Sequence, residues 1–158
     1  MRMTIRHIYI SEQHNYFGHH NQPPGTAAIV EVPKANLVQD KGIEGDRFFD
    51  YKENYKGQVT FFEYETFASL RERFGVFDRG PEAFRRNIVT EGIDLNTLIG
   101  QEFEVQGIRF EGVEEAKPCY WMEQAFCEGA EKSMQGKGGL RARVLSSGVI
   151  QSEKLDID

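Results

Sequence analysis

The sequence predicts a mainly β protein, a closed or partly closed β-barrel with two or three short peripheral helices. About seven or eight short segments have strand-like patterns bounded by glycine, proline, asparagine or aspartate. The few helical patterns do not alternate regularly with the strands, as they do in parallel βαβ folds. The 158 residues also include 12 Phe and 6 Tyr, which favour strands and supply core volume.

The N-terminal half begins with a strand over residues 3–11, in which Ile8 and Ile10 share one face and Ile5, out of phase, indicates a bulge. Further strands are predicted over residues 26–33, 36–39 and 57–62. The polar segment 12–25 contains Gly18, Gly25 and two prolines, which predicts a loop long enough for a functional lid. A tight turn is expected from Gly42 to Asp46.

Two helices are predicted in the middle of the chain. Phe67, Leu70 and Phe74 have the i, i+3, i+7 spacing of one helix face, and Gly75 is expected to end this helix. Pro81 can begin a second, short helix, with Arg85 and Arg86 in its last turn.

The C-terminal half is again predicted to be mainly β. A strand begins near Ile88, a turn follows at residues 94–96, and a hairpin is centred on Gln106-Gly107. Residues 121–134 are expected to be helical, and strands over 139–146 and 148–152 close the fold.

Chain length predicts a single domain over residues 1–158, and the cytoplasm is its expected compartment. The net charge of −6 argues against non-specific nucleic-acid binding and against an anionic membrane surface. No apolar run has the length of a signal peptide or of a membrane span. In that compartment the two cysteines are expected to be thiols, and a position on one helix would put them too far apart for a disulfide.

Cys119 is the strongest candidate for chemistry. It follows a predicted strand and Pro118, close to a predicted helix start. A helix N-terminus or a nearby cation lowers a thiol pKa, and the thiolate attacks electrophiles or binds soft metals. The alternative is a small buried side chain, which is also the preferred interpretation of Cys127.

Cationic segments are candidates for anion binding. Arg85, Arg86 and Asn87 can bind a phosphate or carboxylate through forked hydrogen bonds, or they can form a solvated helix end. A second candidate is a basic, glycine-rich segment that lacks the phosphate-loop spacing. It contains Gly136, Gly138 and Gly139, with Lys137, Arg141 and Arg143.

Metal and acid–base sites are less well supported. The adjacent His19 and His20 would point apart in an extended chain, and His14 completes no metal-binding pattern with them. A solvated polar loop explains these histidines better. A turn is sufficient to explain Glu44 and Asp46.

Four segments in order resemble the MOSC domain family, named after the C-terminal domain of molybdenum-cofactor sulfurases. These segments are KGIEGDR at 41–47, FRRNIVTEGIDLNTLIGQEFEVQGIRFEG at 84–112, KPC at 117–119 and GKGGLRARVLSSGVIQ at 136–151. The resemblance covers most of the chain from about residue 27 to 152. Two departures stand out: Phe48-Phe49 follows Arg47 where many relatives have a histidine, and Ser152-Glu153 replaces a Gly-Asp pair.

The resemblance implies a MOSC-type β-barrel, α+β in detail, that binds the molybdenum cofactor, molybdopterin. Cys119 would ligate molybdenum or carry sulfur. The residues that could hold the cofactor are Arg47, Arg85, Arg86, Asn87 and Arg141. The pyridoxal-phosphate-dependent desulfurase or electron-transfer module of larger relatives is not expected here, so no pyridoxal phosphate site is expected.

The chain therefore resembles stand-alone bacterial members, some of which are linked to reducing N-hydroxylated bases. Such an enzyme would need a small-molecule substrate and a separate reductase, or a desulfurase for sulfur transfer. Two other functions remain open at the level of sequence. One is a non-catalytic carrier of cofactor or sulfur, and the other is a domain that binds a different small anion.

Overall fold

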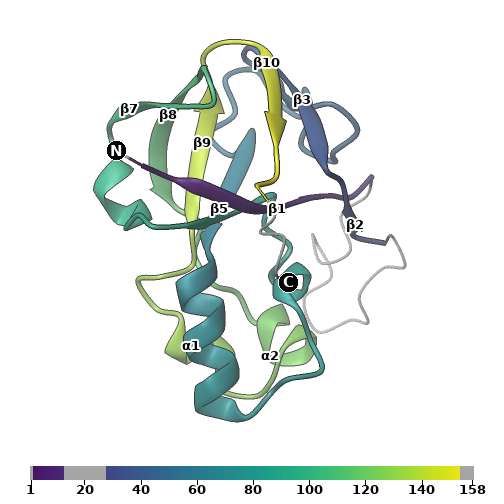
Figure 1. Ribbon diagram of the computed structural model, residues 1–158, viewed down its shortest axis with the longest axis vertical. Helices are drawn as coiled ribbons and strands as arrows, with labels where there is room; N and C mark the ends of the chain where they lie inside the picture. The colour runs from purple at the N-terminus through teal and green to yellow at the C-terminus, as the bar shows by residue number, and fades with distance from the viewer. Residues whose placement is uncertain (1, 13–27, 154–158) are drawn as a thin grey trace.

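The computed structural model describes residues 2–12 and 28–153. Most of the strands form one seven-stranded sheet, and a three-stranded sheet completes the upper part of the molecule (Figure 1). The larger sheet has the order β2-β1-β6-β5-β9-β8-β7, and the smaller one has the order β10-β3-β4. The strands of the two sheets are β1 (Thr4–Ile10), β2 (Val30–Glu31), β3 (Lys34–Val38), β4 (Gly42–Ile43), β5 (Val59–Glu63), β6 (Ile88–Glu91), β7 (Glu102–Val105), β8 (Ile108–Glu115), β9 (Leu140–Val144) and β10 (Gly148–Gln151).

The predicted β-barrel is confirmed in its partly closed form. Buried apolar side chains from both sheets, including Ile8, Leu37, Phe61 and Ile150, pack into one barrel core. Hydrogen-bonded pairing among the described residues does not close the two sheets into a ring. Neighbouring strands are antiparallel except for β5 and β6, which are parallel and connected through helices.

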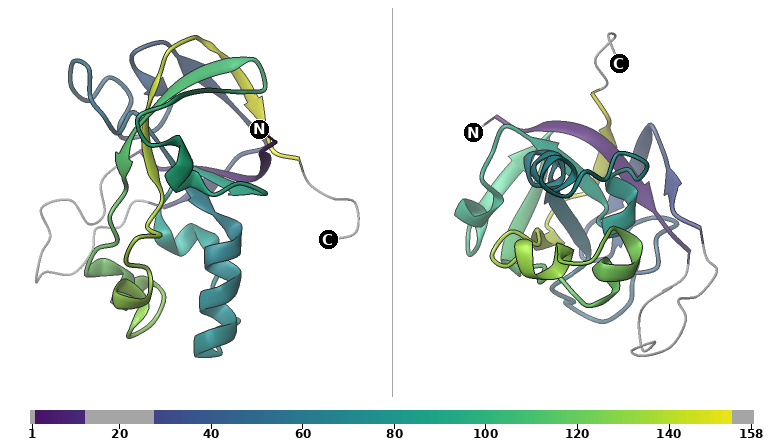
Figure 2. Two further views of the ribbon diagram at one scale, coloured as in Figure 1. Left: turned by 90° about the vertical axis from the view of Figure 1, so that its left-hand side faces the viewer. Right: turned by 90° about the horizontal axis from the view of Figure 1, so that it is seen from below.

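Most of the helices lie together at one end of the barrel, as two further views show (Figure 2). They are α1 (Tyr64–Phe74), the 3₁₀ helix η1 (Pro81–Phe84), α2 (Trp121–Ala125) and α3 (Ala130–Ser133). The other 3₁₀ helix, η2 (Leu95–Leu98), lies beside the strands and packs its buried leucines into the barrel core. A second group of buried side chains joins α1, η1, α2 and α3 to the end of β5. This helix cluster consists of Phe62, Phe67, Leu70, Phe84, Met122, Phe126, Ala130 and Met134.

Several local predictions are confirmed. The pairing of β1 with β6 shifts register between Ile5 and His7, as expected from the phase of Ile5. Gly75 ends α1 in the left-handed region at φ 66°, a conformation that costs glycine little. The β7–β8 hairpin turns at Gln106 and Gly107, both with positive φ, which matches the right-handed twist of the strands.

Other boundaries were wrong. The predicted strand 26–33 is reduced to β2 within the described residues, and the predicted turn at 42–46 contains β4. Residues 121–134 form two short helices, so Cys127 lies between α2 and α3. Arg85 and Arg86 follow η1 instead of forming its last turn, because Arg85 takes a left-handed φ of 56° and ends the helix.

Candidate functional site

Cys119 lies on the connection between β8 and α2, and it is exposed. Its carbonyl oxygen accepts the N–H of Met122 at 3.0 Å, so it belongs to the turn that opens α2. Pro118 before it and Trp121 after it are both buried. The chain is therefore anchored on both sides of a thiol that faces solvent, and the alternative of a buried packing cysteine is wrong for this position.

Arg86 holds the Cys119 loop, residues 115–120, in place. Its Nε donates to the carbonyl oxygen of Gly138 at 2.9 Å. Its Nη2 donates to the carbonyl oxygens of Ala116 at 2.9 Å and Lys117 at 3.2 Å, and its Nη1 reaches the carbonyl oxygen of Phe84 at 3.3 Å. One guanidinium thus connects the end of η1, the segment just before β9 and the two residues that precede Pro118.

The glycine-rich segment also packs against this loop. A Cβ on Gly138 would lie 2.2 Å from the carbonyl oxygen of Ala116, closer than any side chain tolerates. The N–H of Ala116 donates to the carbonyl oxygen of Gly139, and the N–H of Gly138 donates to the carboxylate of Glu115. Lys137, a predicted anion ligand, instead contacts Asp94 at 3.2 Å and Glu63 at 3.6 Å.

The charges around Arg86 define a cationic region beside Cys119. Burial, together with the nearby positive charges of Arg47 and Arg141, lowers the pKa of Arg86 to about 10. The negative charge of an ionised Cys119 acts in the opposite direction, as does Glu115. Two further guanidiniums and one thiol therefore lie within electrostatic range of Arg86.

Arg47 connects the turn after β4 to the end of η1. Its Nη1 lies 3.1 Å from a carboxylate oxygen of Asp46, and its Nη2 donates to the carbonyl oxygen of Arg85 at 3.0 Å. Burial lowers the pKa of Arg47, while Asp46 opposes that shift. Arg85 itself donates to the hydroxyl of Ser11 at 3.2 Å. The sequence segments 46–47 and 85–86 are thus joined in space.

Aromatic rings lie between Arg47 and Arg141. The Arg47 guanidinium is 4.8 Å from the centre of the Phe48 ring, and Phe48 stacks on Tyr55 at 5.6 Å. Arg141 donates to the Tyr55 hydroxyl and lies 5.1 Å from the centre of its ring. Sequence reasoning missed Tyr55, although the dense aromatic run Phe48, Phe49, Tyr51 and Tyr55 was a usable signal.

Asn87 is buried, and its amide connects three strands. Its Oδ1 accepts the N–H of Thr60 at 3.0 Å and the Thr60 hydroxyl at 3.2 Å, while its Nδ2 donates to the carbonyl oxygen of Tyr9 at 3.1 Å. The side chain fixes β1 and β5 against the start of β6. A direct contact between Asn87 and a cofactor stays a prediction.

The remaining candidates lie apart from this site or outside the described residues. His14, His19 and His20 fall in the segment 13–27, which is not described. Cys127 packs against the helix cluster, and burial, followed by the charge of Glu123, raises its pKa. Within residues 2–12 and 28–153 no three His, Cys, Asp or Glu side chains gather in a possible metal site.

A family model described as the MOSC domain matches residues 35–154. The chain belongs to the MOSC domain family. This confirms the resemblance seen in the sequence, and the match includes Cys119, Arg47, Arg85, Arg86, Asn87 and Arg141. The family is associated with molybdenum-cofactor binding and sulfur transfer.

Solved structures share the fold of this MOSC domain. The YuaD protein from Bacillus subtilis has a TM-score of 0.69 and 16% identity, over 96% of this chain and 92% of that one. YiiM from Geobacillus stearothermophilus has a TM-score of 0.64 and 17% identity, over 95% of this chain and 71% of that one. YiiM from Escherichia coli has a TM-score of 0.61 and 17% identity, over 92% of this chain and 65% of that one.

The comparison with curated proteins gave no match. Among the described residues of the MOSC domain, no helix combines the length and the apolar character that crossing a bilayer requires.

Proposed function

We propose that this MOSC domain binds the molybdenum cofactor beside Cys119 and, with electrons from a separate reductase, reduces N-hydroxylated compounds. The observation that carries the proposal is the exposed thiol of Cys119 within electrostatic range of Arg86, a guanidinium that Arg47 and Arg141 also neighbour. A thiolate is a soft ligand suited to a metal already bound to sulfur. Guanidiniums are suited to the phosphate that such a cofactor carries.

Cys119 and the arginines would have different roles in binding the cofactor. Arg86 contacts four backbone carbonyl oxygens, so its role is to position the Cys119 loop. Arg47 uses one hydrogen bond from each terminal nitrogen, which leaves part of its five-proton fork for a ligand. Arg47, Arg85 and Arg141 are therefore the residues that would hold the anionic part, and Cys119 would face the metal.

When bound, the cofactor would supply two-electron redox chemistry at an N–O bond. Reduction of an N–OH group to N–H consumes two electrons and two protons and releases one water. The protein would orient the substrate, and the guanidiniums near Cys119 would favour the negative charge of the bound cofactor. The electrons would come from the separate reductase.

A sulfur carrier is the second candidate, and the exposure of Cys119 favours it. A carrier must present its sulfur to a donor and then to an acceptor, and an exposed thiol on a fixed loop can meet both. Its partner would be a desulfurase that transfers sulfur to the Cys119 thiolate as a persulfide. The loss of molybdenum on mutation of Cys119 is not expected for that function.

The test is elemental analysis of protein produced anaerobically in a host that makes the cofactor. We expect about one molybdenum per chain in the wild type and a large loss in Cys119→Ala. Cys127→Ala is the matched control, because it removes the other thiol outside the cationic region, and it should retain the metal. Reduction of an N-hydroxylated base with a supplied reductase is then measured on the same samples.

Each outcome separates the candidate functions. Metal and turnover lost together in Cys119→Ala, and kept in Cys127→Ala, support the enzyme. Metal bound without turnover favours a cofactor carrier, and persulfide on Cys119 without metal favours a sulfur carrier. Wild-type protein with neither molybdenum nor persulfide would contradict both and leave a domain that binds another small anion.

A further inference from the structure

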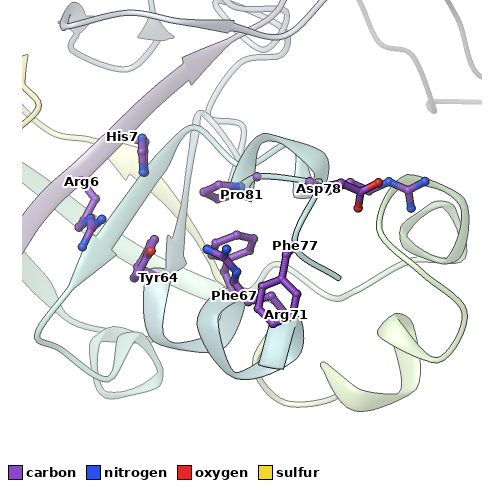
Figure 3. A pocket seen from close by; sticks show the side chains of 10 residues that line it. Arg6, His7, Tyr64, Phe67, Arg71, Phe77, Asp78 and Pro81 are labelled. Atoms are coloured by element: carbon purple, nitrogen blue, oxygen red, sulfur yellow. The ribbon is translucent and has the colours of Figure 1, made fainter. Parts of the chain in front are cut away.

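A groove of about 550 Å³ lies on the face formed by β1, α1 and the loop from α1 to η1 (Figure 3). Its volume is in the range of small-molecule sites. None of Cys119, Arg47, Arg85, Arg86, Asn87 and Arg141 lines it. The groove is thus a second candidate site, separate from the residues to which the proposed function is assigned.

Arg71 on α1 is the notable side chain of the groove. Its guanidinium lies 5.5 Å from the centre of the Phe67 ring and 5.1 Å from that of Phe77, and Figure 3 shows the side chain beside both rings. Its Nε is buried and makes no hydrogen bond. A buried donor left unpaired is costly, so such a group in a native protein calls for an explanation.

The other charged side chains of the groove have partners or lie to one side. Arg6 lies over the ring of Tyr64 at 3.9 Å and contacts Glu91 at 3.3 Å. Figure 3 shows Asp78 directed away from Arg71. Within the described part of the chain, no carboxylate lies within ion-pair distance of Arg71, and its buried Nε is a donor without a partner.

The apolar surface of the groove is aromatic. Phe77 is 61% exposed, which is unusual for so large an apolar side chain. The ring of Tyr64, held under Arg6, and the buried ring of Phe67 belong to the same lining. A flat ring can therefore contact an aromatic wall while an attached anion reaches the guanidinium.

We propose that this groove binds a small aromatic carboxylate, with its carboxylate on Arg71 and its ring against Phe77 and Tyr64. The carboxylate would accept two parallel hydrogen bonds from the fork of Arg71 and would neutralise its charge. Neither an anion alone nor an uncharged ring alone would use both halves of this lining.

The test is titration of ¹⁵N-labelled full-length protein with three probes, followed by amide chemical shifts. Benzoate carries ring and charge, benzamide carries the ring alone, and inorganic phosphate carries charge alone. We expect saturable shifts in β1, α1 and residues 76–81 with benzoate, and at least roughly tenfold weaker binding of the other two. Equal affinity for all three probes would overturn the proposal. So would the absence of benzoate-induced shifts in these segments at benzoate concentrations up to about 50 mM, where even weak specific binding is detectable.

Variants connect the binding to Arg71. Arg71→Met keeps an unbranched side chain between the rings and should weaken benzoate binding roughly tenfold. Arg73→Met is the matched control, because Arg73 lies on the same helix outside the groove and should leave the affinity unchanged. Phe77→Leu removes an exposed ring without affecting the core and should weaken binding several-fold. Unchanged affinity in both Arg71→Met and Phe77→Leu would show that benzoate binds elsewhere.

Discussion

Cys119 and Cys127 differ in their surroundings, and their reactivity should differ accordingly. Cys119 is exposed on its loop, whereas Cys127 is half-buried and has its pKa raised by burial and by Glu123. A cysteine is alkylated through its thiolate form, so a raised thiol pKa slows the reaction at neutral pH. We expect iodoacetamide, at a roughly physiological pH of about 7.5, to label Cys119 about tenfold faster than Cys127. Peptide mass spectrometry over time measures the two rates.

Cys119→Ser provides the control for that measurement. It should leave only the slow phase of labelling, while Cys127→Ser should leave only the fast phase. Equal rates for the two thiols in native protein would contradict the environments described for them.

Asp94 should contribute a small, pH-dependent stabilisation. The backbone N–H of Asn96 and then the ammonium of Lys137 lower the pKa of Asp94 from its ordinary value of 3.8. The contribution is therefore present above pH 3.8 and is lost as the pH falls through the lowered pKa. Because Asp94 is exposed, we expect Asp94→Asn to reduce the free energy of unfolding by less than about 1 kcal/mol at pH 7.

Urea unfolding of wild type and Asp94→Asn at a series of pH values checks this prediction. The difference between the two proteins should shrink as the pH is lowered below 3.8. A difference that stays constant over the acidic range would mean that the charge of Asp94 has no part in the effect.

The contact between Gly138, just before β9, and the Cys119 loop is expected to control the position of the thiol. In Gly138→Ala the new Cβ would meet the carbonyl oxygen of Ala116 at 2.2 Å and the ring of Pro118 at 2.7 Å. The loop must move, at a cost of about 1–3 kcal/mol in the free energy of unfolding. We expect a changed alkylation rate at Cys119 as well as lower stability in urea.

Gly136→Ala is the matched comparison. Gly136 has φ 81° but no atom within 4 Å of an added Cβ, so alanine there strains only the backbone. Its stability should fall by about 1 kcal/mol while the Cys119 alkylation rate stays at the wild-type value. If Gly136→Ala changed that rate as much as Gly138→Ala, the close contact would not be what positions the loop.

Two elements illustrate how far sequence patterns predict local structure. Helix α1 was predicted well because its apolar spacing and its terminal glycine act within one segment. The helix predicted over 121–134 is broken, because Gly129 takes φ 93° and the carboxylate of Glu123 accepts the N–H groups of Gly129 and Glu131. Arg79, distant in sequence, also donates to the carbonyl oxygen of Phe126.

At the scale of the whole molecule, β5 joins the barrel core to the helix cluster. Phe61 points into the barrel core, where it contacts Phe103 and Phe110 edge to face. Phe62, the next residue, points into the helix cluster and contacts Phe84. The alternation of side chains along a strand thus makes one element the common wall of two packed regions.

Phe61→Ala should therefore destabilise the whole fold. Phe61 is fully buried, and its truncation leaves a cavity among other aromatic side chains. We expect a loss of about 3–5 kcal/mol in the free energy of unfolding, measured by urea denaturation. Val149→Ala, at a position that is 49% exposed, is the control and should cost less than about 1 kcal/mol. A similar loss in both variants would contradict the packing described for the barrel core.

The sequence by itself determined the β-rich class, α1, the β7–β8 hairpin and the family, because these depend on periodicity, turn residues and motif order within short segments. It also identified Cys119 and the arginines as candidates. Only the tertiary structure decided their arrangement. Arg86 donates its hydrogen bonds to loop carbonyl oxygens, and the Asn87 side chain connects strands. Arg71, in the groove, has a buried Nε that makes no hydrogen bond. Contacts between residues far apart in the chain leave no local pattern, so no stretch of sequence could have shown them.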